Sequence, residues 1–145
     1  MKRLLLVLAG CAQAIDPEPL GDYTRWPDEG GQLITVRGNA PGHSDSVRLI
    51  YVDPIAADPT HTLAGGYLPG ARIVKEIYAD DDGVIGALRY VAIMRRTGGT
   101  TDGGWLFSET PEPNGAEHTA AFCWARCHVA APYLGAWYDY RLPSP

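Results

Sequence analysis

The feature that most constrains this chain lies near its C-terminus, where two cysteines are followed at once by a histidine: Cys123-Trp124-Ala125-Arg126-Cys127-His128. Two thiols beside an imidazole are the groups by which haem becomes covalently fixed. Each sulfur takes one vinyl group of the porphyrin, and the histidine ligates the iron. The sequence therefore predicts covalent haem c, held by Cys123 and Cys127 with His128 on the iron, and a fold that leaves room for a porphyrin.

The spacing of this motif is wider than usual, with three residues between the cysteines where two are customary. Residues three and four apart share a helical face, so a helix would still present both sulfurs to one porphyrin edge, with His128 one step further round. A disulfide between residues four apart in a helix is geometrically poor. Zinc would need further ligands, which no other free cysteine supplies. Two unrelated buried thiols remain a third alternative.

The N-terminus reads as an export signal, with the basic residues Lys2 and Arg3 followed by the apolar run 4–8. That run is far shorter than the roughly twenty apolar residues that span a bilayer. The segment Leu8-Ala9-Gly10-Cys11 resembles the lipobox of bacterial lipoproteins, which predicts a lipid on Cys11; ordinary cleavage after Ala14 is the alternative. We therefore expect a periplasmic protein, lipid-anchored to the membrane, and c-type haem attachment in bacteria occurs outside the cytoplasmic membrane.

Length and charge limit the remaining options. Residues 1–20 are expected to be signal peptide and short tether, and residues 21–145 are the size of one domain. Acidic residues outnumber basic ones by 17 to 12, which gives a net charge of −5. Such a surface argues against nucleic acid as a partner.

The sequence pattern in the middle of the chain is typical of strands and turns. Short apolar or alternating runs, separated by Gly, Pro and Asp clusters, predict antiparallel strands at 33–36, 47–52, 71–79, 87–95 and 105–108. A short helix is expected at 22–27. A last helix is expected to begin near Asn114, with Glu117 completing a capping box, and to carry the cysteine motif to about Ala131. The predicted fold class is α+β: mainly antiparallel sheet with a short N-terminal helix and a C-terminal haem-attachment helix.

Lys75 is the only lysine beyond the export signal, whereas every other basic residue there is arginine. The strand period of two places Lys75 on the same face as Ile73 and Ile77. A lysine amine can lose its proton and react, which a guanidinium cannot. The alternative is a strand lysine that reaches solvent or pairs with an acid.

At this point the sequence resembles a known family, the cytochrome P-460 type haem proteins and their relatives, the β-sheet cytochromes c′. The segment Pro69-Gly70-Ala71-Arg72-Ile73-Val74-Lys75-Glu76, combined with a haem motif late in the chain, is fairly specific. The resemblance covers nearly the whole domain: residues 22–26, His43, 47–52, 68–76, 103–107, the motif and 138–140.

The resemblance implies an antiparallel sheet enclosing a c-type haem with one axial histidine, His128, and an open distal side. In the hydroxylamine-oxidising members a lysine is cross-linked to the porphyrin, which makes Lys75 a candidate. In the cytochrome c′ relatives that bond is absent, and the iron binds nitric oxide or carbon monoxide. The expected partners are a small nitrogen-oxide ligand or substrate and a redox partner cytochrome; the relatives are often dimers, so a homodimer is a further expectation. An electron-transfer cytochrome with a sixth ligand is the alternative.

Other side chains were weighed for the site. Met94, the only methionine beyond the export signal, is expected to be a core residue rather than a sulfur ligand. Surface positions are expected for the histidines, although His43 matches a position in the family. The candidates for a proton acceptor are Glu76, Glu109, Glu117 and the run Asp80-Asp81-Asp82, although the aspartates are more simply explained as a solvated turn. The candidates for lining the pocket are Phe107, Phe122 and the tyrosines.

Overall fold

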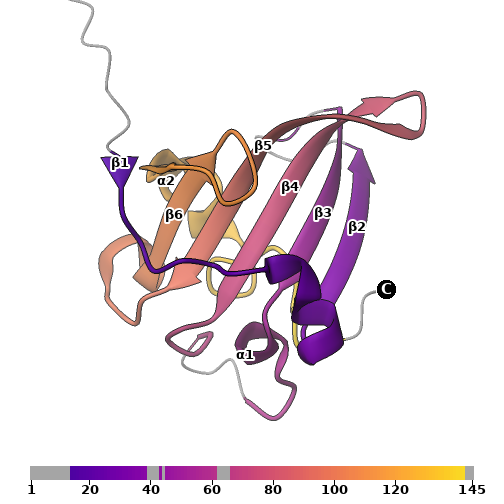
Figure 1. Cartoon of the computed structure of the whole chain (residues 1–145). Coiled ribbons are helices and arrows are strands. Elements are labelled where there is room, and N and C mark those ends of the chain that lie inside the picture. The colour runs from indigo at the N-terminus through magenta and orange to yellow at the C-terminus, as the bar shows by residue number, and fades with distance from the viewer. Residues whose placement is uncertain (1–13, 39–42, 44, 62–65, 143–145) are drawn as a thin grey trace, which may run out of the picture.

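The computed structural model describes residues 14–38, 43, 45–61 and 66–142, so the segment predicted to be an export signal and the predicted lipid site at Cys11 lie outside the described residues. The described chain forms one antiparallel seven-stranded sheet in the order β1-β7-β6-β5-β4-β3-β2 (Figure 1). The prediction of a mainly antiparallel β fold is thus confirmed. The strands are β1 (Ala14–Ile15), β2 (Gln32–Gly38), β3 (Ser46–Val52), β4 (Arg72–Asp81), β5 (Val84–Arg96), β6 (Trp105–Thr110) and β7 (Glu117–Thr119).

The helices are few and short. They are the 3-10 helix η1 (Tyr23–Glu29), the α-helix α1 (Pro54–Ala57), the 3-10 helix η3 (Thr101–Gly104), the α-helix α2 (Phe122–Arg126) and the 3-10 helix η4 (His128–Ala130). No helix in the described part of the chain has the length and apolar character needed to cross a membrane.

The first helix lies where the sequence predicts one, but it is a 3-10 helix and it contains Pro27 instead of ending there. It ends at Gly30, whose φ of +97° is the left-handed conformation that glycine adopts without a steric penalty. The segment before it, expected to be a tether, is partly packed on the sheet: β1 pairs with β7, and the side chain of Leu20 is buried.

The long last helix predicted from Asn114 to Ala131 is wrong. Asn114 has a φ of +56° and lies in a turn, and residues 117–119 form strand β7 beside β6. The Glu117 carboxylate accepts hydrogen bonds from Nη1 and Nη2 of Arg95 at 2.6 and 2.7 Å. This ion pair across the sheet holds the segment extended, and it outweighs the local capping preference.

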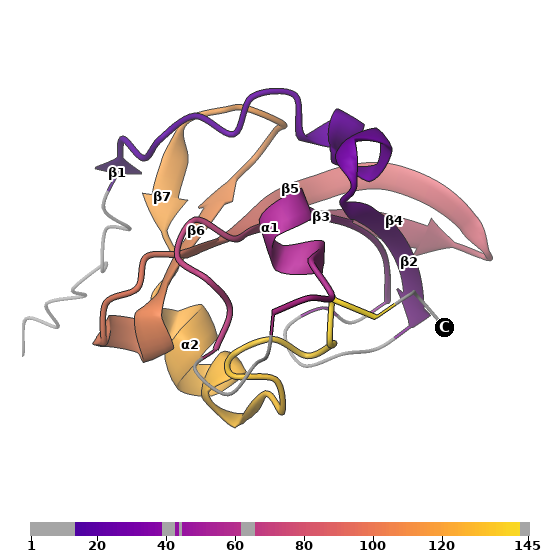
Figure 2. The same cartoon turned by 90° about the horizontal axis from the view of Figure 1, so that it is seen from below.

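The sheet is strongly curved, and its two faces are covered by different parts of the chain (Figure 2). On the concave face lie α1, α2 and the C-terminal segment, and on the convex face lies η1. The alternation along β4 follows this division as predicted: Ile73 belongs to the concave cluster, with Met94 and Phe107, whereas Val74 belongs to the convex cluster, with Tyr23.

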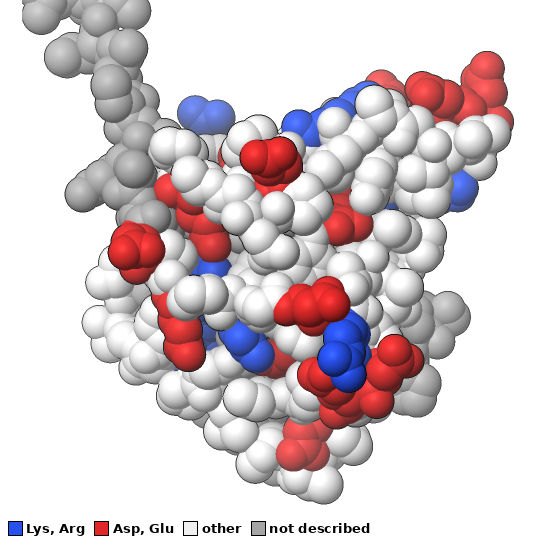
Figure 3. Space-filling view, in the orientation of Figure 1, with Lys and Arg blue, Asp and Glu red and all other residues white. Residues whose placement is uncertain are grey.

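The surface carries mixed charge. On the face shown in Figure 3 acidic side chains are spread widely, with basic ones interspersed among them. Asp81 and Asp82 are exposed at the turn between β4 and β5, and Asp80 pairs with Arg37 at 3.1 Å. Only Asp82 lies in the solvated turn that was expected for the whole run, because Asp80 and Asp81 are the last residues of β4.

Candidate functional site

The cysteine motif spans the end of one helix and the start of another. Helix α2 ends at Arg126, and Cys127 has φ −132° and ψ −58°, outside the helical region. The predicted continuous helix through the motif is therefore wrong. The Cys127 N–H still bonds to the Cys123 carbonyl at 3.2 Å, so the two cysteines remain one turn apart. The break at Cys127 turns His128 inward, where its side chain is buried.

Both thiols are free and partly buried. A Cys123–Cys127 disulfide is thus not formed in this structure. The zinc alternative also lacks support, because no group of three or more His, Cys, Asp or Glu side chains in the described part of the chain is arranged to hold a metal ion.

His128 is held in the orientation that a metal-ligating histidine requires. Its Nδ1 lies 2.7 Å from the carbonyl oxygen of Gly135. A carbonyl only accepts, so Nδ1 carries the proton and Nε2 keeps its lone pair. Burial lowers the pKa of His128 and keeps the ring neutral. A backbone carbonyl that fixes the tautomer in this way is the usual second partner of a metal-bound histidine.

The carbonyl that orients His128 belongs to a tight turn at residues 133–136, which the sequence analysis did not identify. Gly135 has a φ of +94°, and a Cβ there would lie 2.8 Å from Nε1 of Trp105. The same Trp105 Nε1–H donates to the carbonyl of Leu134 at 2.9 Å. Trp105 thus fixes the turn, and only glycine fits beneath it. The signal available was the pair Leu134-Gly135 following Pro132.

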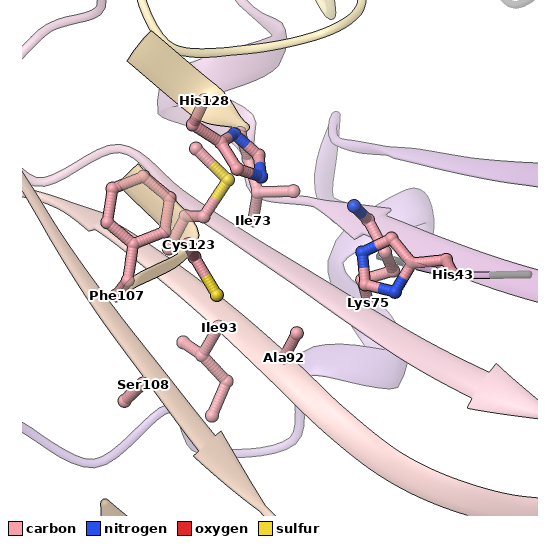
Figure 4. Close-up of a pocket in the computed structure, with 10 residues that line it drawn as sticks. His43, Ile73, Lys75, Ala92, Ile93, Phe107, Ser108, Cys123 and His128 are labelled. Carbon is pink, nitrogen blue, oxygen red and sulfur yellow. The ribbon is translucent and has the colours of Figure 1, made fainter. Parts of the chain in front are cut away.

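The motif faces a cavity of about 350 Å³, which we call the motif cavity. Its volume lies within the usual range for small-molecule sites. It is lined by His43, Tyr90, Glu109, Phe122, Cys123, Arg126, Cys127 and His128. A smaller cavity adjoins it, shares His43, Cys123 and His128 with it, and forms its inner part. The further residues that line this inner part come from β4, β5 and β6, and most of them are labelled in Figure 4: Ile73, Lys75, Ala92, Ile93, Met94, Phe107 and Ser108.

Lys75 is buried, with 9% of its surface exposed, and lines the inner part of the motif cavity. No hydrogen bond or ion pair joins its amine to any described residue. Neither alternative weighed for it, solvent exposure or pairing with an acid, describes its surroundings. Burial, reinforced by the charge of Arg48, lowers the pKa of Lys75 from 10.5 to about 8.

His43 is not a surface histidine as expected. It is half-buried, lines both parts of the cavity and lies beside Lys75 in Figure 4. Its Nδ1 is 2.8 Å from the Tyr90 hydroxyl, and burial lowers its pKa to about 3. The neighbouring Pro41-Gly42 made this stretch read as a surface turn. His61 and His118 are exposed, as expected.

The acidic candidates lie in different parts of the structure, and Glu109 alone of the three glutamates lies at the cavity. Glu109 lines the motif cavity, 3.8 Å from the sulfur of Cys123, and burial raises its pKa. Glu76 lies on the convex face with Tyr23, and Glu117 is bound to Arg95. Among the acids of the described chain, Glu109 is the one that lines this cavity.

The apolar and aromatic candidates divide between the two faces: Met94, Phe107, Phe122 and Tyr90 line the cavity, whereas Tyr23 and Tyr51 lie in the convex cluster. Met94 is a buried core residue that also lines the inner cavity, and Phe107 packs on the His128 ring at 4.9 Å between ring centres. Phe122 lines the motif cavity.

Comparison with known proteins supplies no family. No model of a known protein family matches the chain, and a search of curated proteins finds no significant match. The function is therefore argued from the cavity.

Proposed function

We propose that this chain is a periplasmic, lipid-anchored c-type haem protein of the cytochrome P-460 and β-sheet cytochrome c′ type, acting on small nitrogen oxides. The observation that carries the proposal is the state of His128: buried and neutral, with Nδ1 bound to the Gly135 carbonyl and Nε2 left as a metal ligand, beside two free thiols at a cavity. Bound haem would supply an iron with one open position, where a small nitrogen oxide can bind.

The residues around the cavity fit this cofactor. Cys123 and Cys127 would hold it through thioethers, and His128 would ligate the iron. The carbonyl of Gly135 keeps the imidazole in the required tautomer. Apolar side chains such as Phe107 and Met94 line the inner cavity beside the buried amine of Lys75.

Two versions of the function share these residues. In the enzymatic version, oxidation of hydroxylamine, Glu109 is placed to accept a proton, and its raised pKa brings it closer to the neutral range. Lys75 as a porphyrin cross-link stays a prediction, supported by its burial in the same cavity and by an amine that loses its proton readily. Electrons would leave to a separate cytochrome. In the binding version, the protein holds nitric oxide without a cross-link.

An electron-transfer cytochrome is the second candidate function, because two side chains in the cavity are chemically able to supply a sixth ligand. They are His43, whose imidazole is neutral, and Met94. Both belong to the described chain and neither is exposed.

Carbon monoxide and a single lysine variant separate these candidates. The holoprotein, reduced with dithionite, is expected to bind carbon monoxide rapidly, and failure to bind would favour the electron carrier. A Soret band far to the red that is lost in Lys75→Arg would support hydroxylamine oxidation. An ordinary high-spin ferrous spectrum, unchanged in Lys75→Arg, would support nitric oxide binding.

A further inference from the structure

A buried arginine on the concave face has few partners among the described residues. Arg48 on β3 is 4% exposed. Its guanidinium donates one hydrogen bond among the described residues, from Nη2 to the carbonyl of Gly38 at 3.2 Å. Its Nε is buried with no partner, and no carboxylate in the described chain forms an ion pair with it. A buried charge left in this state is costly.

The sheet register places Arg48 on the concave side. Arg48 lies opposite Ile77 on β4, just as Ile50, two residues on, lies opposite Lys75. Residues two apart on a strand share a face, so the guanidinium and the Lys75 amine belong to the same side. Burial is the main cause of the lowered pKa of Lys75 and of His43, and the positive charge of Arg48 adds to both shifts, so these groups lie within electrostatic reach of one another.

Other arginines in this protein are matched with acids. Arg95 is bound to Glu117, Arg72 to the fully buried Asp53 at 3.0 Å, and Arg141 to Asp139 at 2.6 Å. Arg48 and Lys75 together bring two buried cations to one region of the concave face, and no described carboxylate pairs with either. The acid that does line the cavity, Glu109, lies beside Cys123.

We propose that Arg48, with Lys75 beside it, binds a carboxylate on the concave face, and that in the haem-loaded protein this carboxylate is a propionate side chain of the haem. A guanidinium is a planar fork that matches a carboxylate with two parallel hydrogen bonds. The inference rests on the proposed function, because it takes the carboxylate from the cofactor.

The placement of the cysteines favours this source. Haem carries its vinyl groups and its propionates on opposite sides of the ring, so thioethers at Cys123 and Cys127 direct the propionates away from the motif. Cys123 contacts Glu109 of β6, and β6 is separated from β3 by β5 and β4. Neighbouring strands lie about 4.8 Å apart, so Arg48 is roughly 14 Å across the sheet from β6. Figure 4 shows Lys75 across the cavity from Cys123 and Phe107.

Two porphyrins test the proposal on the full chain prepared without attached haem. Ferric protoporphyrin IX has two free carboxylates, and in its dimethyl ester both are blocked. We expect the wild-type chain to bind the free acid at least about tenfold more tightly, which is the factor that a hydrogen bond to a charged group carries. Arg48→Met should abolish this preference. Arg37→Met, at an exposed arginine of β2, should keep it.

The outcomes distinguish the inference from the function on which it rests. Equal affinity of the wild-type chain for both porphyrins would overturn the propionate assignment while leaving the haem proposal standing. If the wild type binds neither porphyrin and the exported protein carries no haem, both fail. If nitrite raises the Tm of the wild type but not of Arg48→Met, while neither chain prefers the free acid, then the site takes a free oxyanion and the propionate assignment is wrong.

A second measurement covers the case in which Arg48→Met does not fold. In exported holoprotein, Arg48→Lys keeps the charge and loses the fork. We expect it to shift the propionate bending band of the resonance Raman spectrum, with Arg37→Met leaving the band in place. An unmoved band in Arg48→Lys would contradict a bond between Arg48 and a propionate.

Discussion

Lys75 and Glu76 are consecutive buried residues of β4 with ionisable side chains, but they lie on opposite faces of the sheet and differ in their hydrogen-bond partners. On the convex face the Glu76 carboxylate accepts hydrogen bonds from the hydroxyls of Tyr23 at 2.6 Å and Tyr78 at 2.8 Å. On the concave face the Lys75 amine has no such partner in the described chain. The convex face satisfies its own charge, whereas the concave face carries charge that a bound group would have to match.

The same contrast is visible in the titration of the two faces. Burial and the Glu76 carboxylate raise the pKa of Tyr78 to about 12, because an ionised Tyr78 would lose its hydrogen bond to that carboxylate and repel it. Burial, reinforced by the positive charge of Arg48, lowers the pKa of Lys75 to about 8. Glu76 therefore stabilises the folded chain by itself, and Lys75 costs stability until a ligand compensates it.

The largest effect is expected from removing the satisfied acid. Glu76→Leu leaves the hydroxyls of Tyr23 and Tyr78 without their acceptor. A hydrogen bond to a charged group contributes about 2 kcal/mol for the buried Tyr23 and about 1 kcal/mol for the partly exposed Tyr78, so the free energy of unfolding should fall by about 3 kcal/mol. Urea unfolding of the chain without haem measures it. Glu29→Leu, at an exposed acid paired only with exposed Arg25, should change it by less than about 0.5 kcal/mol. Equal losses in both variants would remove the contrast between the faces.

Removing the unpaired cation of Lys75 should raise the free energy of unfolding, whereas removing Glu76 lowers it. The pKa of Lys75 falls from 10.5 to about 8 on folding, so below pH 8 the buried ammonium costs about 3 kcal/mol. Lys75→Met should therefore raise the free energy of unfolding of the chain without haem by up to about that amount at pH 7. The measurement is again urea unfolding.

The pH dependence sharpens this prediction. Between pH 8 and 10 the unfolded chain keeps the lysine proton that the folded chain has lost, so wild-type stability rises with pH relative to Lys75→Met. The gain from Lys75→Met should shrink across that window. Tyrosine ionisation is common to both chains and cancels in the difference. A variant less stable than the wild type at pH 7 would contradict an uncompensated lysine.

The smallest effect separates the two tyrosines. Tyr23 is 1% exposed and Tyr78 is only partly buried, so Tyr23→Phe should cost about 2 kcal/mol and Tyr78→Phe about 1 kcal/mol. Urea unfolding compares the two, and the absorption spectrum of the holoprotein should be the same in both. A changed spectrum would mean that the convex network acts on the cofactor.

The correct predictions concern local properties of the sequence, and the wrong ones concern contacts between residues that are far apart in it. The strand alternation around Lys75 is a local property and was read correctly, with Ile73 and Val74 on opposite faces. The helix from Asn114 failed because the contact that decides it, Arg95 with Glu117, joins residues 22 apart. The position of His43 depends on Tyr90 of β5, which is 47 residues away in the sequence.

For the site, the spacing of the motif predicts three residues, but it does not predict how they are held. The orientation of His128 depends on the carbonyl of Gly135 and, through the turn, on Trp105 in β6. Arg48 carries no motif; its importance becomes visible only when its burial and the lack of a carboxylate partner in the described chain are known. Such contacts join distant segments, and local patterns do not encode them.

The most direct test of the central claim is whether haem is covalently attached through Cys123 and Cys127. We would export the protein from a host that matures c-type cytochromes, extract it with acidified organic solvent and determine its intact mass. The account predicts that the haem stays with the protein and adds the mass of one haem to the chain, and that a Cys123→Ser/Cys127→Ser variant loses it. Haem that passes into the organic phase, leaving a chain of unmodified mass, would contradict it.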